Sequence, residues 1–164
     1  MRSTLKRVTR PMAEHTATIK WVSQGEDFLS GKYSREHTWA FDGGAVIPAS
    51  PAPAVVPVPY SNPDHVDPEE AFVASVSSCH MLTYLYLAGR AGFSIQQYVD
   101  EAVGVMAKGD NGVPWVSTIT LRPQITYGTD KTPTPEESEQ LHHHAHEQCF
   151  IANSIKTEVV VKPA

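Results

Sequence analysis

The longest apolar stretch of the chain, residues 71–88, predicts a central helix that is buried on most of its sides. Its start carries three signals of a helix N-terminus. Asp67 can act as the N-cap, Pro68 suits the first helical position, and Glu70 completes a capping box. Two glycines directly after the run are expected to end the helix.

A second helix is predicted by the same type of start. Thr134 is the expected N-cap, Pro135 the first helical residue, and Glu137 the partner that completes the capping box. Asn153 is the expected end of this helix. Four residues share one face at helical spacing, namely Leu141, Ala145, Cys149 and Ala152.

The remaining apolar positions alternate and predict strands, at residues 15–23, 34–41, 97–109, 114–128 and 155–162. The "KGDNGVP" segment between the third and fourth of these favours a long hairpin. Strands, helix, hairpin, helix and strand follow one another along the chain. This order predicts an α+β fold in which a mainly antiparallel sheet packs with two long helices.

Domain organisation follows from length and from the distribution of prolines. A chain of 164 residues suits one domain, which we expect to span residues 15–164, after a flexible N-terminal arm at residues 1–14. Six prolines fall in "PASPAPAVVPVPYSNP" at residues 48–63. We expect this segment to be an extended surface loop and not a linker between domains.

Charge and composition exclude several functions. The net charge is −5 and no long block of lysine and arginine occurs, so we expect no nucleic-acid partner. The basic N-terminal residues are followed by no apolar run, so we expect neither export nor membrane insertion, and a cytoplasmic location. In that compartment thiols are kept reduced, and a disulfide is more often catalytic than structural.

The two cysteines are the candidate reactive groups. Cys79 lies in the middle of the first predicted helix and Cys149 deep in the second, beyond the reach of either helix N-terminal dipole. Because only the thiolate reacts, a catalytic Cys79 needs a cation from another part of the chain. On spacing alone, the pattern favours small buried hydrophobes at both positions, because buried free cysteine is common.

The "HHHAHEQC" segment offers histidines at helical spacing, such as His142 with His146, and an i, i+4 pair of His143 with Glu147. A zinc site needs three or four ligands, and no further cluster stands near these in the sequence. We therefore predict a solvated histidine face with no native metal, and no cofactor.

Both helices resemble those of the family of osmotically inducible protein C and organic hydroperoxide resistance proteins (OsmC/Ohr). The segment "DPEEAFVASVSSC" is similar to the family pattern around its first cysteine, and "AHEQCFIANS" to the pattern around its second. The segment "YSREHTWAFDGG" is similar to the family's arginine-bearing segment. The resemblance extends from Ala17 to Lys162. Phe150 and His80 depart from the residues common in the hydroperoxide branch, which places the chain in the OsmC-like branch.

This resemblance implies a set of roles. Cys79 corresponds to the peroxidatic cysteine, Cys149 to the resolving cysteine, Glu69 to the catalytic glutamate and Arg35 to the catalytic arginine. A guanidinium can hold a thiolate on one edge and a carboxylate on another. The resemblance also implies an intertwined homodimer that is reduced by an external dithiol, such as a lipoylated protein or another thiol.

The spacing of Glu69 and Cys79 restricts how they can meet. Ten residues of straight helix rise about 15 Å, too far for one guanidinium to touch both side chains. Either the helix bends, or Arg35 and Glu69 reach Cys79 across a dimer interface. The apolar central helix favours the second arrangement.

The sequence and the resemblance together predict a cysteine-based peroxidase that reduces organic hydroperoxides, and hydrogen peroxide as a further substrate, in oxidative-stress defence. Cys79 would form a sulfenic acid that Cys149 resolves. Two alternatives stay open: a non-catalytic small-molecule binding protein on the same scaffold, and a cysteine hydrolase or acyltransferase that uses Cys79.

Overall fold

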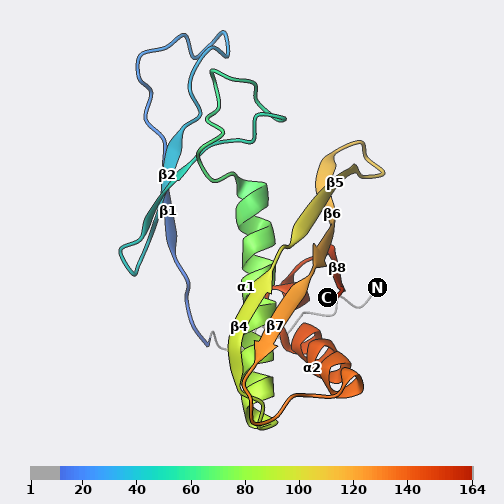
Figure 1. Ribbon diagram of the computed structural model, residues 1–164. Coiled ribbons are helices and arrows are strands. Elements are labelled where there is room, and N and C mark those ends of the chain that lie inside the picture. Colours follow the sequence, from blue (N-terminus) through green and yellow to red (C-terminus); the bar gives the residue numbers. More distant parts are fainter. Residues whose placement is uncertain (1–11, 164) are drawn as a thin grey trace, which may run out of the picture. The chain divides into compact units, whose positions relative to one another are not determined.

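A computed structural model describes residues 12–163, and the chain divides into two compact units, Met1–Val66 and Asp67–Ala164 (Figure 1). Each unit is described by itself below. The predicted flexible arm at residues 1–14 lies largely outside the described residues. The single domain at residues 15–164 stays a prediction.

The first unit contains a three-stranded antiparallel sheet in the order β1-β2-β3. Its strands are β1 (Ala17–Lys20), β2 (His37–Phe41) and β3 (Val46–Ala49). β3 was not expected, because it includes Pro48, which the sequence assigns to the extended loop. Proline lacks a backbone N–H but is tolerated on an edge strand, and β3 is an edge of this sheet.

The second unit begins with α1 (Pro68–Arg90), whose predicted start is confirmed. Asp67 accepts a hydrogen bond from the backbone N–H of Glu70, and the Glu70 side chain accepts one from the backbone of Asp67. Ala91 is the C-cap, and Gly92 follows with a φ of +83°, a conformation that favours glycine.

Four strands of the second unit replace the predicted long hairpin, and a fifth follows α2 (Pro135–Gln148). They are β4 (Ile95–Asp100), β5 (Val103–Lys108), β6 (Pro114–Leu121), β7 (Pro123–Tyr127) and β8 (Glu158–Val161). β4 pairs with β7 and β5 with β6, both antiparallel, so the hairpin exists but is interrupted at residues 101–102 and at Arg122. β8 joins β6 in parallel. The expected α+β class with antiparallel-rich sheets and two helices is confirmed.

The core of the second unit consists of two clusters, each built around α1. The first joins the C-terminal half of α1 to α2 (Pro135–Gln148) and contains Tyr84, Ala88, Phe93, Leu141 and Ala145. The second joins the N-terminal half of α1 to β6 and contains Val76, Ile119 and Leu121. Figure 1 shows α2 beside α1 in this unit.

One stripe of α1 is buried within the described chain, at Val76, His80, Tyr84 and Ala88. The sequence predicted burial on most sides by the sheet and by a partner chain. Within the single chain Leu82 is 60% and Tyr86 59% exposed, so burial by a partner stays a prediction. Within the described residues, α1 is the helix long and apolar enough to span a membrane by composition, with a mean hydropathy of 1.3. Its buried stripe packs on α2 and the strands, as expected for the core helix of a globular unit.

Candidate functional site

The packing of α2 on α1 brings the two cysteines together, although 70 residues separate them in the sequence. Cys79 lies in the middle of α1 and Cys149 directly after the last turn of α2. Both are free thiols. The backbone N–H of Ile151 donates to Cys79 Sγ over 3.5 Å, and that of Ala152 donates to Cys149 Sγ over 3.4 Å.

The end of α2 differs from the sequence prediction. The helix was expected to continue through Cys149 to Asn153, but it ends at Gln148 and Cys149 is its C-cap, with extended φ and ψ of −69° and 114°. A short 3₁₀ helix, Ala152–Ser154, follows. The physical reason is local: the Asn153 side chain donates to the carbonyl of Glu147, which would accept the N–H of Ile151 if the helix continued, and also to the carbonyl of Cys149.

The two thiols differ in environment. Cys149 is 1% exposed, whereas Cys79 is half-buried. Burial first, and the neighbouring Cys79 side chain second, raise the pKa of Cys149 to about 11. Cys149 therefore keeps its proton at neutral pH. Its S–H group lies beside the Cys79 sulfur, which can accept a hydrogen bond from it.

A buried histidine pair lies on the neighbouring face of α1. His80 Nε2 is 3.1 Å from His142 Nδ1, and the two rings are stacked with an interplanar angle of 4°. Burial lowers the pKa of each ring to about 4. The predicted solvated histidine face is thus wrong for His142, which is 4% exposed, while the predicted pair of His143 with Glu147 is confirmed at 3.2 Å.

The sequence contained a signal for this pair that the prediction did not use. His80 occupies the same four-residue spacing as Val76, Tyr84 and Ala88, the buried stripe of α1. His142 follows Leu141 on the face that packs against α1. A histidine at such a position is more often a core residue than a surface residue.

Glu69 does not lie beside the cysteine of its own helix. α1 continues without interruption from Pro68 to Arg90, so Glu69 in its first turn is about 15 Å from Cys79 along the axis. Glu69 instead lines a cavity of about 720 Å³ between the start of α1 and the strands. Neither cysteine is among the residues that line this cavity.

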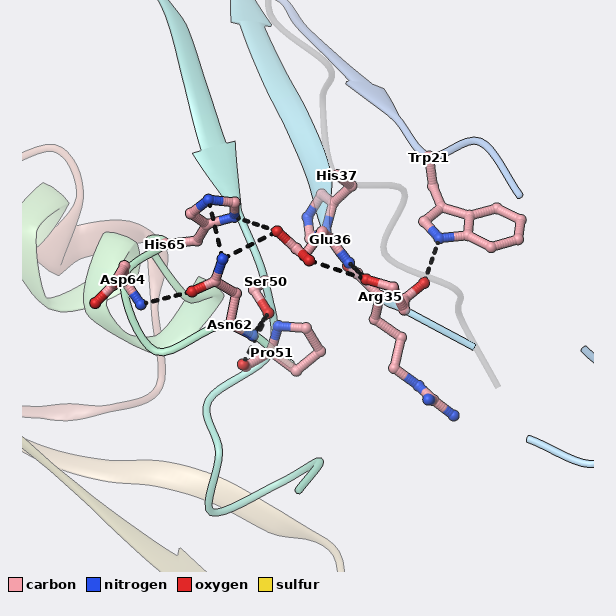
Figure 2. Close-up of polar contacts among 10 residues, drawn as sticks. Trp21, Arg35, Glu36, His37, Ser50, Pro51, Asn62, Asp64 and His65 are labelled. Atoms are coloured by element: carbon pink, nitrogen blue, oxygen red, sulfur yellow. Dashed lines mark hydrogen bonds and ion pairs between the residues drawn. The ribbon is translucent and has the colours of Figure 1, made fainter. Parts of the chain in front are cut away.

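Arg35 belongs to the first unit and lies two residues before β2 (Figure 2). Backbone carbonyls accept hydrogen bonds from its guanidinium. Nη1 donates to the carbonyls of Tyr33 at 2.7 Å and Gly31 at 3.2 Å, and Nη2 donates to Gly31 at 3.1 Å. The guanidinium carbon also lies 3.9 Å from the centroid of the Tyr33 ring. These contacts use only part of the five donors of the guanidinium.

A polar network next to Arg35 was not predicted. The side chain of Asn62 donates to Glu36 at 3.0 Å, and His65 Nδ1 lies 3.4 Å from the same carboxylate. The hydrogen bond from Asn62 lowers the pKa of Glu36. Figure 2 shows the Arg35 guanidinium pointing away from this network, so Glu36 does not neutralise it.

A groove of about 550 Å³ adjoins the cysteine pair. Its lining residues come from α1 and from the end of α2, and they are Leu82, Thr83, Tyr86, Glu147, Gln148, Phe150 and Asn153. Thr83 donates to the carbonyl of Cys79 over 2.9 Å, which connects this groove to the first cysteine. Phe150 is 83% exposed here. Among residues 12–163, no group of three or more His, Cys, Asp or Glu side chains could hold a metal ion.

Comparison with known proteins identifies relatives of the whole chain. A family model described as OsmC-like protein matches residues 61–164. A solved OsmC-like protein of unknown function from Vibrio cholerae is 48% identical, and the match covers 93% of this chain and 100% of that chain with a TM-score of 0.91. No match was found among curated proteins.

More distant structures share the fold. An organic hydroperoxide resistance protein from Legionella pneumophila has a TM-score of 0.68 at 16% identity and covers 94% of this chain and 97% of that chain. Another organic hydroperoxide resistance protein, from Elizabethkingia anophelis with thiocyanate bound, has a TM-score of 0.69 at 19% identity. That match covers 94% of this chain and 96% of that chain.

Proposed function

The chain belongs to the OsmC-like protein family, and we propose that it is a thiol-dependent peroxidase that reduces organic hydroperoxides and hydrogen peroxide in defence against oxidative stress. The observation that carries this proposal is the convergence of Cys79 and Cys149, one from the middle of α1 and one from the end of α2. Two free thiols in this arrangement can pass between dithiol and disulfide. Two relatives of the same fold bear the name organic hydroperoxide resistance protein, which is consistent with this activity.

Cys79 is the proposed peroxidatic residue and Cys149 the resolving residue. Cys79 is half-buried and so is the more accessible sulfur, while burial raises the pKa of Cys149 to about 11 and keeps it protonated. The Ile151 N–H donates to Cys79 Sγ and favours negative charge on that sulfur. The nucleophile is therefore Cys79, and Cys149 acts after it.

The proposed reaction proceeds in three balanced steps. The Cys79 thiolate attacks one peroxide oxygen, the O–O bond breaks, and the leaving alkoxide takes a proton to become an alcohol, or water from hydrogen peroxide. Cys79 becomes a sulfenic acid. Cys149 then attacks the Cys79 sulfur, an S–S bond forms and water leaves. An external dithiol, a lipoylated protein or another thiol, returns two electrons by thiol–disulfide exchange.

Arg35 and Glu69 are the proposed electrostatic partners of Cys79. An arginine stays charged and can bind a thiolate and a carboxylate at once. Since α1 is uninterrupted, Glu69 cannot reach the Cys79 of its own helix. We therefore place Glu69 at the Cys79 of a second copy in a homodimer. The exposed apolar residues Leu82 and Tyr86 on α1 are consistent with a partner chain on this helix.

The cytoplasm is the proposed location, because a peroxidase that cycles through a disulfide needs a compartment that supplies reducing thiols. A cysteine hydrolase, by contrast, would gain nothing from a second thiol beside its nucleophile. A binding protein on this scaffold stays the second candidate, since the cavity of about 720 Å³ at the start of α1 contains neither cysteine.

Consumption of tert-butyl hydroperoxide and of hydrogen peroxide with dithiothreitol tests the proposal. Cys79→Ser should abolish activity, and Ser78→Ala, one residue earlier in α1, should retain it. If Cys79→Ser keeps more than about a tenth of wild-type activity, Cys79 is not the nucleophile. A tenfold loss of rate corresponds to an increase of about 1.4 kcal/mol in the activation free energy. If wild type itself consumes neither peroxide, the binding protein becomes the better assignment.

A further inference from the structure

The turn that follows α2 contacts both sulfur atoms through consecutive backbone groups. The N–H of Ile151 donates to Cys79 Sγ at 3.5 Å and the N–H of Ala152 donates to Cys149 Sγ at 3.4 Å. A single turn thus contacts both sulfurs through neighbouring N–H groups. Its conformation should matter most at the step in which those sulfurs bond.

Asn153 fixes this turn by three hydrogen bonds. Its side-chain Nδ2 donates to the carbonyl of Glu147 at 2.7 Å and to that of Cys149 at 2.9 Å, and its backbone N–H donates to Cys149 at 3.0 Å. These are carbonyls that the end of a helix leaves without intrahelical partners. Asn153 satisfies them and holds the following residues in the turn.

We propose that Asn153 is a positioning residue for disulfide formation between Cys79 and Cys149. It touches neither sulfur and acts through the turn whose N–H groups at Ile151 and Ala152 hold them. This role rests on the proposed function and adds to it the residue that controls the resolving step.

The geometry of a disulfide explains why such a residue matters. Two cysteines bond only within a narrow range of Cα separation and S–S torsion, so freedom in the turn separates the reacting atoms. Cys149 attacks the Cys79 sulfur, the S–O bond of the sulfenic acid breaks, and oxygen leaves as water with the proton of the Cys149 thiol. A second peroxide competes by oxidising the sulfenic acid to the sulfinic acid. The turn therefore decides how the sulfenic acid partitions between the two outcomes.

Two substitutions test this role. Asn153→Asp keeps the shape but removes both side-chain donors, and Asn153→Ala removes the side chain. After a pulse of tert-butyl hydroperoxide, rapid quenching and mass spectrometry give the rates of Cys79 oxidation and of disulfide formation. We expect disulfide formation to slow about tenfold, from the loss of two hydrogen bonds, with more Cys79 sulfinic acid. The first oxidation of Cys79 should change by less than about threefold, since the turn gives its sulfur a single N–H contact at 3.5 Å.

Ser154→Ala is the matched control, because its hydroxyl donates to the carbonyl of Phe150 in the same turn over 2.7 Å and touches neither helix-end carbonyl. It should behave like wild type. Thermal unfolding checks that each variant folds, and Asn153→Ser, which keeps one donor, replaces any variant that does not. Asn153→Ser should give an intermediate rate of disulfide formation.

A second oxidant separates this inference from the proposed function. Diamide takes two electrons from a dithiol and forms the disulfide without any peroxide reaction. If wild type ignores peroxide but diamide joins Cys79 to Cys149 more slowly in the Asn153 variants, the peroxidase proposal fails and the positioning role stands. If every folded Asn153 variant forms the disulfide at the wild-type rate with either oxidant, the positioning role is overturned.

Discussion

His80 Nε2 lies 3.1 Å from His142 Nδ1, and this contact joins α1 to α2 across 62 residues of sequence. Only one of the two nitrogens can carry the shared proton. The other ring nitrogens, His80 Nδ1 and His142 Nε2, are buried and have no hydrogen-bond partner among the described residues. The contact between the rings is therefore one hydrogen bond between two neutral imidazoles, and protonating either one would place two donors face to face or leave a charge buried.

The free energy of unfolding should decrease in acid because of the pair of His80 and His142. The folded pKa values of about 4 are below the ordinary value of 6.5, so the unfolded chain binds protons first as pH decreases. The stabilisation is complete above pH 6.5 and is lost as pH falls toward 4. By linkage, the pair contributes on the order of 3 kcal/mol that disappears across this window, since the two rings titrate together. Urea unfolding at a series of pH values measures the loss.

Two histidine variants isolate this contribution from the acid titration of carboxylates. Replacing both rings, by His80→Phe with His142→Leu, should flatten the stability profile between pH 6.5 and 4. His143→Gln, at a side chain that is 67% exposed, should leave the profile as in wild type. A profile in the double variant as steep as in wild type would show that the pair does not titrate as described.

Gly104 should be intolerant of any side chain. A Cβ at this residue of β5 would lie 2.5 Å from Cγ2 of Val73 on α1, closer than real Cβ contacts. Gly104→Ala should therefore push β5 away from α1 and destabilise the protein by about 1–3 kcal/mol, as overpacked sites do. Gly89→Ala on α1 is the control, because a Cβ there meets nothing within 4 Å, and it should stabilise by about 0.5–1 kcal/mol. Equal effects of the two substitutions in denaturant unfolding would contradict this packing.

The starts of both helices could be predicted from the sequence because a capping box is a local motif. Asp67 with Glu70 and Thr134 with Glu137 lie within one turn of each other and need no tertiary contact. The end of α2 could not be predicted, since it depends on which carbonyls the Asn153 side chain finds. Helical spacing alone predicted that the helix continues as far as that residue.

Contacts between distant segments explain the other differences. The parallel pairing of β8 with β6 and the contact of His80 with His142 each join segments that no local pattern relates. The pairing of Cys79 with Cys149 followed from the family resemblance and not from spacing. Arg35 as the catalytic arginine stays a prediction, because the structure shows how its guanidinium is held within its own unit and not what its free donors bind.

Removing the second thiol should stop the cycle after the first oxidation. In Cys149→Ser, a pulse of tert-butyl hydroperoxide should leave Cys79 as a sulfenic acid that dimedone traps, or as a sulfinic acid, and turnover with dithiols should be impaired. Wild type should give a disulfide between Cys79 and Cys149 within one chain. Mass spectrometry that finds only free thiols, or only disulfides between chains, in peroxide-treated wild type would remove Cys149 from the resolving role.

A shared site between two copies predicts that two inactive variants restore each other. Losing Glu69 should raise the activation free energy by roughly 2–4 kcal/mol, as for one pre-organised electrostatic group. Glu69→Ala should therefore be nearly inactive, and Cys79→Ser should be inactive as well. When their subunits exchange after mild denaturation, half of the sites in each mixed dimer combine an intact Cys79 with an intact Glu69 from the partner. Random exchange makes half of the dimers mixed, so activity should recover toward about a quarter of wild type.

The control for this exchange is a Cys79→Ser subunit that also carries Glu69→Ala, which brings no glutamate to its partner. Mixed with Glu69→Ala, it should restore nothing. Light scattering and mass spectrometry of the mixture establish that dimers form and that subunits have exchanged. If the first mixture then stays as inactive as its parents, Glu69 does not act across an interface. Because α1 is uninterrupted and keeps Glu69 about 15 Å from its own Cys79, that result would mean that Glu69→Ala loses activity without any direct contact between Glu69 and a Cys79 side chain.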